Sequence, residues 1–358
     1  MKAMVLDAPY RFRADDRPVP PLQPGWARIK VAAAGICGSD IHFYTGELPI
    51  TPGSVRGHEI AGTIVDPGDT GLPVGQAVVV HPLLGCGACP ACLRGQQQLC
   101  ANLTAVGGQH PGGFAEFTAA PLQNIYPFDA KALSFSHAAL ADCVAVAVHA
   151  MNAVGLSDGD SAVVLGDGSI GLLLLQAALA RGAHSVIVAG KHEFNLELAR
   201  QLGATLAFDG TTQDAVAVVQ AAAGQVDAVF EAVGGPNPPL AAGLRMLRKG
   251  GRLATLGLTS AENVAIPWID VVFSELSLVG VMGYGTFYGQ DEMQQALDLM
   301  QAGRIALEPL ITLTVPLQDV DRGFRAMLSR TASPCIKVLV LPQNAVGDGA
   351  GTLERRRP

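Results

Sequence analysis

The chain has 358 residues, of which 49% are hydrophobic and 15% are charged, and it carries a formal net charge of −7 at pH 7. This composition supports a sizeable apolar core and excludes a disordered chain, and the acidic balance argues against nucleic acid as a partner. No apolar run approaches the ~20 residues of a membrane span and the N-terminal residues lack a signal-peptide pattern, so we expect a cytoplasmic protein without a membrane partner.

Short β-type runs, separated by glycine and proline, fill residues 1–135. They include WARIKVAAAG, EIAGTIVD, QAVVVHP and FAEFTAAP, and such a series of short strands predicts a compact β-rich domain. Residues 137–155 follow as an alanine- and valine-rich stretch that ends near Gly155, which predicts a helix.

From residue 161 the pattern changes to apolar strands that alternate with helices. SAVVLG, SVIVAG and VDAVFEAVG are strand-like, whereas IGLLLLQAALARG and EFNLELARQLG have helical character. This alternation predicts a doubly wound parallel sheet. The last part, with ITLTVPL and CIKVLVLP, returns to strand–helix–strand and can rejoin the β-rich domain.

Four of the seven cysteines lie close together in the sequence, as Cys86, Cys89, Cys92 and Cys100. Four thiolates at short spacing on a loop rich in glycine and proline suit tetrahedral zinc, and a closed four-sulfur site is structural rather than catalytic. The alternatives are an iron–sulfur cluster and four thiols that bind no metal.

A second set of metal-ligand side chains lies in GICGSDIH and RGHEIAG, which contain Cys37 and His58. Both residue types are good zinc ligands, and a catalytic zinc needs only three protein ligands, which leaves one position open. On its own, the pair of Cys37 and His58 is weak evidence for a metal site, because a free cysteine is usually a buried structural residue. The same chain also contains the cysteine cluster and the glycine-rich nucleotide loop described next, so a catalytic zinc is the favoured interpretation.

The nucleotide loop is G-x-G-x-x-G, formed by Gly166, Gly168 and Gly171 with Ser169 and Ile170 between the last two. In such loops the glycines permit a tight turn, the approach of a pyrophosphate and close packing of helix on strand. The phosphate charge then faces a helix N-terminus. We therefore predict a dinucleotide site.

The next strand ends at Gly190, and Lys191 and His192 follow it. A site for NAD has an acid about 20 residues after the loop, and this acid accepts the ribose hydroxyls. Glycine instead leaves room for a 2′-phosphate, while the lysine supplies a charge and the histidine a donor. This pattern favours NADP(H) over NAD(H). The alternative is that the lysine is a solvated turn residue and NAD still binds, more weakly.

Together these motifs resemble the zinc-dependent medium-chain dehydrogenase/reductase family. GICGSDIHFYTG, GHEIAGTIV, the cysteine cluster, GDGSIG, FEAVG and LRKGGRLATLG occur in the family's order, and the likeness is to alcohol, polyol and threonine dehydrogenases. The resemblance implies an α/β fold with a GroES-like β-rich catalytic domain (residues 1–143 and 287–343). A Rossmann dinucleotide-binding domain (residues 144–286) is inserted in it, and residues 344–358 form a flexible tail.

The resemblance also assigns roles to residues near the first metal-ligand pair. Cys37 and His58 become ligands of a catalytic zinc, and Glu59 is the adjacent acid that can approach the metal. Asp40 resembles the carboxylate that orients the histidine ligand.

For the third ligand, the family's pattern in LADCVAVAVHA favours Asp142 and leaves Cys143 as the alternative. Ser39 and His42 resemble the relay that carries the alcohol proton to solvent.

The activity that the resemblance implies is hydride transfer between NADP(H) and a secondary alcohol or polyol, or the matching ketone, with a catalytic and a structural zinc in each chain. An aldehyde or primary-alcohol dehydrogenase is the runner-up, and an inactive dinucleotide-binding relative is the alternative from another class. Val233, Gly257 and Leu258 are expected to contact the nicotinamide half, and Tyr44 to line the substrate pocket. A homodimer or homotetramer is expected, and residues 276–283 are the candidate edge strand for pairing.

Overall fold

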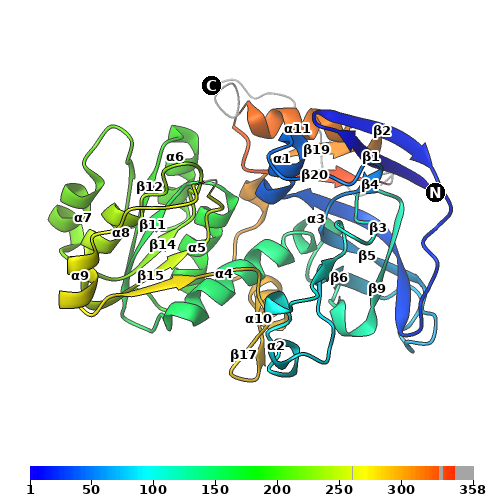
Figure 1. Cartoon of the computed structure of the whole chain (residues 1–358), viewed down its shortest axis with the longest axis horizontal. Helices are drawn as coiled ribbons and strands as arrows, with labels where there is room; N and C mark the ends of the chain where they lie inside the picture. The colour runs from blue at the N-terminus through cyan, green and yellow to red at the C-terminus, as the bar shows by residue number, and fades with distance from the viewer. Residues whose placement is uncertain (260, 330–333, 343–358) are drawn as a thin grey trace.

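The computed structural model describes residues 1–259, 261–329 and 334–342. Figure 1 shows two bodies, one rich in β-strands and the other built on a parallel sheet with helices around it. Helix α4 (Ala141–Val154) lies between them. In the part of the chain that is described, none of the helices combines the length and the apolar character needed to cross a bilayer.

The β-rich body centres on a sheet with the order β10-β6-β5-β3-β20-β19, and β9 also pairs with β3. Its strands are β3 (Trp26–Ile36), β5 (Glu59–Asp66), β6 (Ala77–Val80), β9 (Phe117–Pro121), β10 (Ile125–Pro127), β19 (Ile311–Pro316) and β20 (Lys337–Leu341). β20 pairs antiparallel with β3, with Val338 opposite Ile36. The C-terminal strands therefore return to the N-terminal sheet, as their sequence pattern predicted.

A smaller sheet of β1 (Lys2–Ala8), β2 (Arg11–Asp16) and β4 (Ser54–Val55) completes this body with helices α1 (Gly38–Thr45) and α11 (Val320–Leu328). The Tyr44 ring lies 4.8 Å from that of Phe324 and 5.7 Å from that of Phe12, measured between centroids. Tyr44 is fully buried, and its hydroxyl donates to Asp321 at 2.6 Å. The expectation that Tyr44 lines the substrate pocket was wrong, because its place one turn after Asp40 puts it on the buried face of α1.

The second body is a parallel sheet with the order β13-β12-β11-β14-β15-β16. Its strands are β11 (Ser161–Leu165), β12 (Ser185–Gly190), β13 (Leu206–Asp209), β14 (Val226–Glu231), β15 (Leu247–Thr255) and β16 (Ser277–Gly280). The connecting helices are α5 (Ser169–Ala180), α6 (Glu193–Gln201), α7 (Ala215–Ala223), α8 (Leu240–Met246) and α9 (Trp268–Phe273). Every residue of β11 is buried, as a central parallel strand requires. The chain thus forms the doubly wound sheet predicted from its alternating pattern, and β12 and β14 on either side of β11 mark the switch point where such sheets bind ligands.

A continuous apolar core joins the two bodies. Eleven of the residues of α4 are buried, and this helix packs on α5 and on α10 (Glu292–Gln301). The same core includes Ala61 of β5 and Leu172 of α5. The elements that carry the metal-ligand residues and the glycine-rich loop are therefore held by one packed interior.

Candidate active site and metal centres

The four clustered cysteines lie on a lobe formed by β7 (Leu83–Leu84), α2 (Pro90–Leu93), a 3-10 turn (Gln97–Leu99) and β8 (Thr104–Ala105). Their sulfur atoms all lie within 4.8 Å of one another. Zn–S bonds of about 2.3 Å in a tetrahedron place the sulfurs roughly 3.8 Å apart. The sulfurs of Cys89 and Cys92 lie 3.5 Å apart, so this donor set suits zinc.

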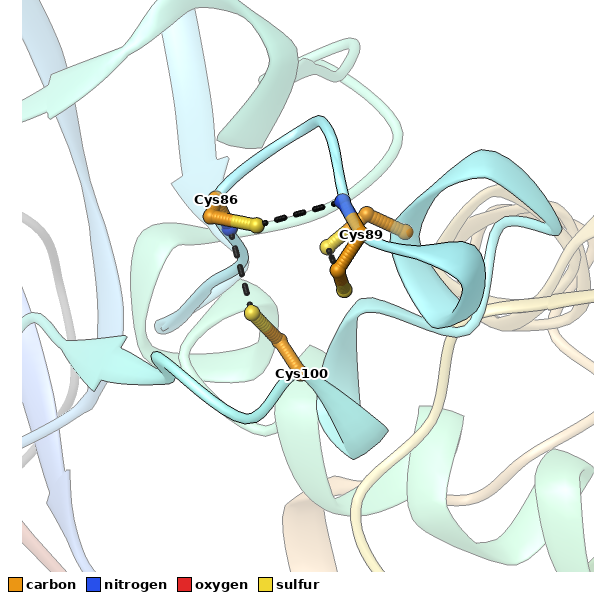
Figure 2. A group of neighbouring side chains, drawn as sticks. Cys86, Cys89 and Cys100 are labelled. Atoms are coloured by element: carbon orange, nitrogen blue, oxygen red, sulfur yellow. Dashed lines mark hydrogen bonds between the residues drawn. The ribbon is translucent and has the colours of Figure 1, made fainter.

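Backbone donors point at the same sulfurs (Figure 2). The N–H of Cys86 donates to Cys100 Sγ at 3.3 Å, and the N–H of Cys89 donates to Cys86 Sγ at 3.4 Å. The Cys92 backbone N–H, followed by its thiol, lowers the pKa of Cys89 to about 6. The donors at Cys89 favour thiolate, the form that binds a metal, whereas burial raises the pKa of Cys92 to about 11.

The second group comes together because β3 and β5 pair antiparallel. Gly35 lies opposite Glu59 in that ladder, so Cys37, just beyond the end of β3, meets His58, just before β5. The ligand atoms of Cys37, His58 and Glu59 all lie within 4.8 Å of one another. A Cβ at residue 35 would lie 1.8 Å from Glu59 Oε2, so glycine is required there.

Asp40 supports this group from α1. The residue is 1% exposed, and its carboxylate accepts the Cys37 N–H at 3.2 Å and lies 3.6 Å from Nδ1 of His58. Burial opposes its ionisation, yet His58 and then Arg56 hold the pKa of Asp40 below its ordinary value. Burial likewise opposes the charged form of His58, and Asp40 and Cys37 nevertheless raise the pKa of His58 well above its ordinary value. The Asp40 carboxylate therefore faces one ring nitrogen of His58.

Glu59 is tied to two residues from distant parts of the chain. Lys337 Nζ lies 2.8 Å from Oε1 and 2.9 Å from Oε2, and the Cys143 thiol donates to Oε1 at 3.0 Å. Sequence reasoning missed Lys337, and the signal that could have found it is a lysine inside the apolar strand CIKVLVLP.

Asp142 and Cys143 form with Glu59 a further group whose ligand atoms lie within 4.8 Å of one another. Asp142 accepts a hydrogen bond of 2.7 Å from the hydroxyl of Tyr284, and burial raises the pKa of Asp142 to about 6. Cys143 is 2% exposed, burial raises the pKa of its thiol, and its sulfur lies 3.3 Å from Lys337 Nζ. The Cys143 sulfur is therefore already engaged by Glu59 and Lys337. Tyr284 is a further residue that the sequence did not single out.

Ser39 and His42 lie on α1, in the helix that begins beside Cys37. The His42 side chain is 32% exposed, and its Nδ1 lies 2.7 Å from Oε2 of Glu47, which is itself largely exposed. This arrangement gives a histidine with one nitrogen held by a carboxylate at the solvent boundary, as a proton relay to water needs.

The glycine-rich loop has the geometry that a dinucleotide site requires. Gly166 has a φ of +117°, and a Cβ there would lie 2.9 Å from the Ala232 carbonyl. A Cβ on Gly171 would lie 1.9 Å from the Gly166 carbonyl. Gly168 caps α5, whose first residues are Ser169 and Ile170, so backbone N–H groups of this helix are free to face a phosphate.

The loops after β14 and β15 meet over the same edge of the sheet. Buried Glu231 accepts the N–H groups of Val233 and Gly234, each at 2.8 Å, and the hydroxyl of Thr255 at 2.9 Å. A Cβ on Gly257 would lie 2.2 Å from the Gly234 nitrogen. Val233 and Leu258 are 56% and 55% exposed beside these contacts. They are apolar surfaces available to a flat ring at the carboxyl ends of the strands.

A parallel dinucleotide-type sheet joined to a β-rich body with two groups of zinc-ligand side chains defines a zinc-binding dehydrogenase. Two family models match the chain, the alcohol dehydrogenase GroES-like domain at residues 23–130 and the zinc-binding dehydrogenase at residues 169–302. The chain is 31% identical to L-threonine 3-dehydrogenase from Bacillus velezensis, over 96% of this chain and 99% of the relative. It is 29% identical to sorbitol dehydrogenase from Bacillus subtilis, over 96% and 97% of the two chains. A Sinorhizobium meliloti protein of the zinc-binding dehydrogenase type, solved with NADP bound, matches with a TM-score of 0.85 and 30% identity, over 95% and 99%.

The chain therefore belongs to the zinc-dependent medium-chain dehydrogenase/reductase family. This result confirms the resemblance read from the motifs, the GroES-like and Rossmann architecture, and the expectation of an oxidoreductase. The chain is a zinc-type alcohol or polyol dehydrogenase that works with zinc and a nicotinamide dinucleotide on small-molecule alcohols.

Proposed function

We propose that this protein transfers a hydride between NADP(H) and a secondary alcohol or polyol, or the matching ketone. The observation that carries the proposal is the group of Cys37, His58 and Glu59, whose ligand atoms lie within 4.8 Å of one another in a chain with a dinucleotide loop. When bound at these residues, zinc would supply Lewis-acid charge at the alcohol oxygen, and the nicotinamide would be the hydride acceptor.

Cys37, His58 and Asp142 are the protein ligands of the catalytic zinc in this proposal. Asp142 is favoured over Cys143 because the Cys143 sulfur already lies 3.0 Å from Glu59 Oε1 and 3.3 Å from Lys337 Nζ. Glu59 belongs to both ligand groups, which suits an acid that approaches the metal during ligand exchange. The lobe cysteines Cys86, Cys89, Cys92 and Cys100 hold the structural zinc.

In this proposal, residues of helix α1 carry the proton between the substrate and solvent. The Ser39 hydroxyl accepts the alcohol proton as it gives up its own proton toward His42, and His42 releases a proton to solvent while its Nδ1 lies 2.7 Å from Oε2 of Glu47. Asp40 keeps His58 oriented and does not exchange protons with substrate, because it is buried between His58 and Arg56.

The cofactor preference is for NADP(H). Residue 190, which ends β12, carries no carboxylate of its own, although that of Asp167 lies beside it, and Lys191 is exposed directly after it. A lysine charge beside the adenosine ribose favours the 2′-phosphate. The loop of Gly166, Gly168 and Gly171 holds the pyrophosphate, and Val233, Gly257 and Leu258 contact the nicotinamide half.

The domain division follows the sheets. Residues 1–143 and 287–343 form the catalytic domain and residues 144–286 the dinucleotide domain, which is supported by the return of β20 to β3. The protein assembles as a homodimer or homotetramer through β16 and α9, where Trp268, Ile269 and Phe273 are 64%, 66% and 75% exposed. A cytoplasmic location suits the thiol-rich lobe, since that compartment keeps thiols reduced.

The test is metal analysis together with a panel of polyols, sugars and simple alcohols assayed with both dinucleotides. We expect about two zinc ions per chain and reduction of NADP by secondary alcohols. Turnover confined to primary alcohols or aldehydes would change the substrate class. A chain that binds dinucleotide, holds only the lobe zinc and turns over none of the panel is an inactive relative and contradicts the proposal.

A further inference from the structure

The second residue of the glycine-rich loop, Asp167, reaches across to the end of the neighbouring strand. Its side chain is 6% exposed, and Oδ2 accepts the backbone N–H of Lys191 at 3.0 Å and that of His192 at 2.6 Å. Nδ1 of His192 lies 3.0 Å from Oδ1 and 3.2 Å from Oδ2. The carboxylate therefore fixes the turn that joins β12 to α6.

Asn195 adds a second connection between the same segments. Its side-chain amide donates to the Asp167 carbonyl at 2.8 Å, and the residue is 4% exposed. The glycine loop and the first turn of α6 are thus joined by both the backbone and the side chain of Asp167.

The same carboxylate occupies the space of a side chain at residue 190. A Cβ on Gly190 would lie 2.4 Å from Asp167 Cβ, 2.5 Å from Cγ and 2.6 Å from Oδ2. Gly190 is outside the left-handed region of φ, so its backbone accepts any residue. The three atoms nearest to that Cβ position all belong to Asp167, so its side chain accounts for the glycine at the strand end.

We propose that Asp167 determines the cofactor preference of this protein by taking the place of the strand-end acid. An acid at residue 190 would present free oxygens to the ribose hydroxyls of NAD. The acceptors of the Asp167 carboxylate are instead used within the protein: Oδ2 accepts two backbone N–H groups, and Oδ1 lies 3.0 Å from Nδ1 of His192. The turn is held with Lys191 exposed toward solvent, where its ammonium can meet a 2′-phosphate. This inference rests on the proposed dinucleotide site and names the residue that sets its selectivity.

The steric part of the proposal is tested by a double-mutant cycle of Gly190→Ala, Asp167→Gly and the double variant. Gly190→Ala alone is expected to raise the KM of both dinucleotides about tenfold, because the methyl group and Asp167 overlap. In the Asp167→Gly background the same alanine is expected to change KM less than about twofold. Equal effects of the alanine in both backgrounds would overturn the proposal.

The selectivity part is tested by moving the acid back to the strand end, in Asp167→Gly/Gly190→Asp. Relative to Asp167→Gly, this variant is expected to lower the ratio of kcat/KM for NADP to that for NAD about tenfold or more. An unchanged ratio would contradict the assignment.

Asp214 provides a matched control. Its carboxylate also accepts two backbone N–H groups, of Val216 at 3.1 Å and Ala217 at 3.2 Å, where it caps α7 of the same sheet. Asp214→Gly is expected to lower Tm and to leave the dinucleotide ratio unchanged. Titration of the wild-type protein with NADPH and NADH distinguishes a failure of the proposed function from a failure of the role proposed for Asp167. If neither binds, the proposed function itself fails, whereas binding with an additive cycle defeats only the role of Asp167.

Discussion

Lys337 and Glu59 form a buried ion pair beside the candidate catalytic zinc ligands. Lys337 Nζ lies 2.8 Å and 2.9 Å from the two carboxylate oxygens, and the side chains are 2% and 0% exposed. Burial opposes the charged lysine, but Cys143 and Glu59 raise the pKa of Lys337 above its ordinary value. The ammonium also donates to the Ile36 carbonyl at 3.3 Å, directly before Cys37. The pair therefore connects β20, β3 and β5 at the point where the metal ligands meet.

Replacing Lys337 by methionine should destabilise the protein strongly. The change leaves the Glu59 carboxylate buried without a counter-charge, which typically costs about 3–5 kcal/mol. The free energy of unfolding in urea measures the loss. The double variant Lys337→Met/Glu59→Gln carries no unpaired charge and should recover much of it. A single variant within about 1 kcal/mol of wild type would show that the pair contributes little.

The third zinc ligand is decided by a comparison of Asp142→Ala with Cys143→Ala. The first variant is expected to lose the catalytic zinc and to keep the lobe zinc, because Asp142 offers a carboxylate oxygen within 4.8 Å of a ligand atom of Glu59, the residue that also groups with Cys37 and His58. The second should keep both, since the Cys143 sulfur is engaged by Glu59 and Lys337. Zinc content per chain measured by atomic absorption gives the answer, and the reverse pattern would make Cys143 the ligand.

Local signals in the sequence predicted the parts of the site that depend on short spacings. The four lobe cysteines lie within residues 86–100, so their meeting needs only one loop. The glycine-rich loop is likewise predictable from a short stretch of sequence, because it consists of one strand, one turn and one helix. Cys37 and His58 are further apart, and motif order together with the antiparallel register of β3 and β5 brings them to one place.

Contacts between distant segments were not predictable in the same way. Lys337 is 278 residues from Glu59, and the two meet only because β20 joins β3. Tyr284 reaches Asp142 over 142 residues. The expectation that Tyr44 lines the substrate pocket was wrong, because a tyrosine next to a catalytic motif carries no sequence signal that tells which face of α1 it occupies. Asp167 was passed over because the fingerprint leaves its position free, and only the structure shows that its carboxylate fills the space at Gly190.

Asp227 joins the central strands of the parallel sheet, and its contribution should depend on pH. Its carboxylate accepts the Ser161 N–H at 2.8 Å and hydroxyl at 2.7 Å, and Arg248 Nε donates to it at 2.6 Å. Burial opposes ionisation, but these donors lower the pKa of Asp227 from 3.8 to about 2.

Because the folded pKa lies below the unfolded one, the carboxylate stabilises the fold above about pH 4, and this stability is lost as the pH falls toward about 2. Asp227→Asn is therefore expected to cost about 1–2 kcal/mol at pH 7, discounted for partial exposure. The gap between variant and wild type should narrow between pH 4 and pH 2.5, as urea unfolding at each pH can show. A gap that stays constant would mean that the amide merely disturbs packing.

Lys191 should carry the charge that distinguishes the two dinucleotides. It is exposed immediately after Gly190, and its backbone is held by Asp167 at 3.0 Å, so its side chain is free while its position is fixed. A charge-assisted contact with a 2′-phosphate is worth roughly 1.5–3 kcal/mol, so Lys191→Ala is expected to raise the KM for NADP about tenfold or more. The KM for NAD should change little, because NAD has no phosphate for the lysine to meet. Lys249→Ala is the matched control, since Lys249 is an exposed lysine of the same domain near the start of β15, whereas the glycine loop follows the end of the parallel strand β11. An unchanged KM for NADP in Lys191→Ala, or a wild-type kcat/KM for NAD well above that for NADP, would show that the turn at Gly190 does not select the phosphate.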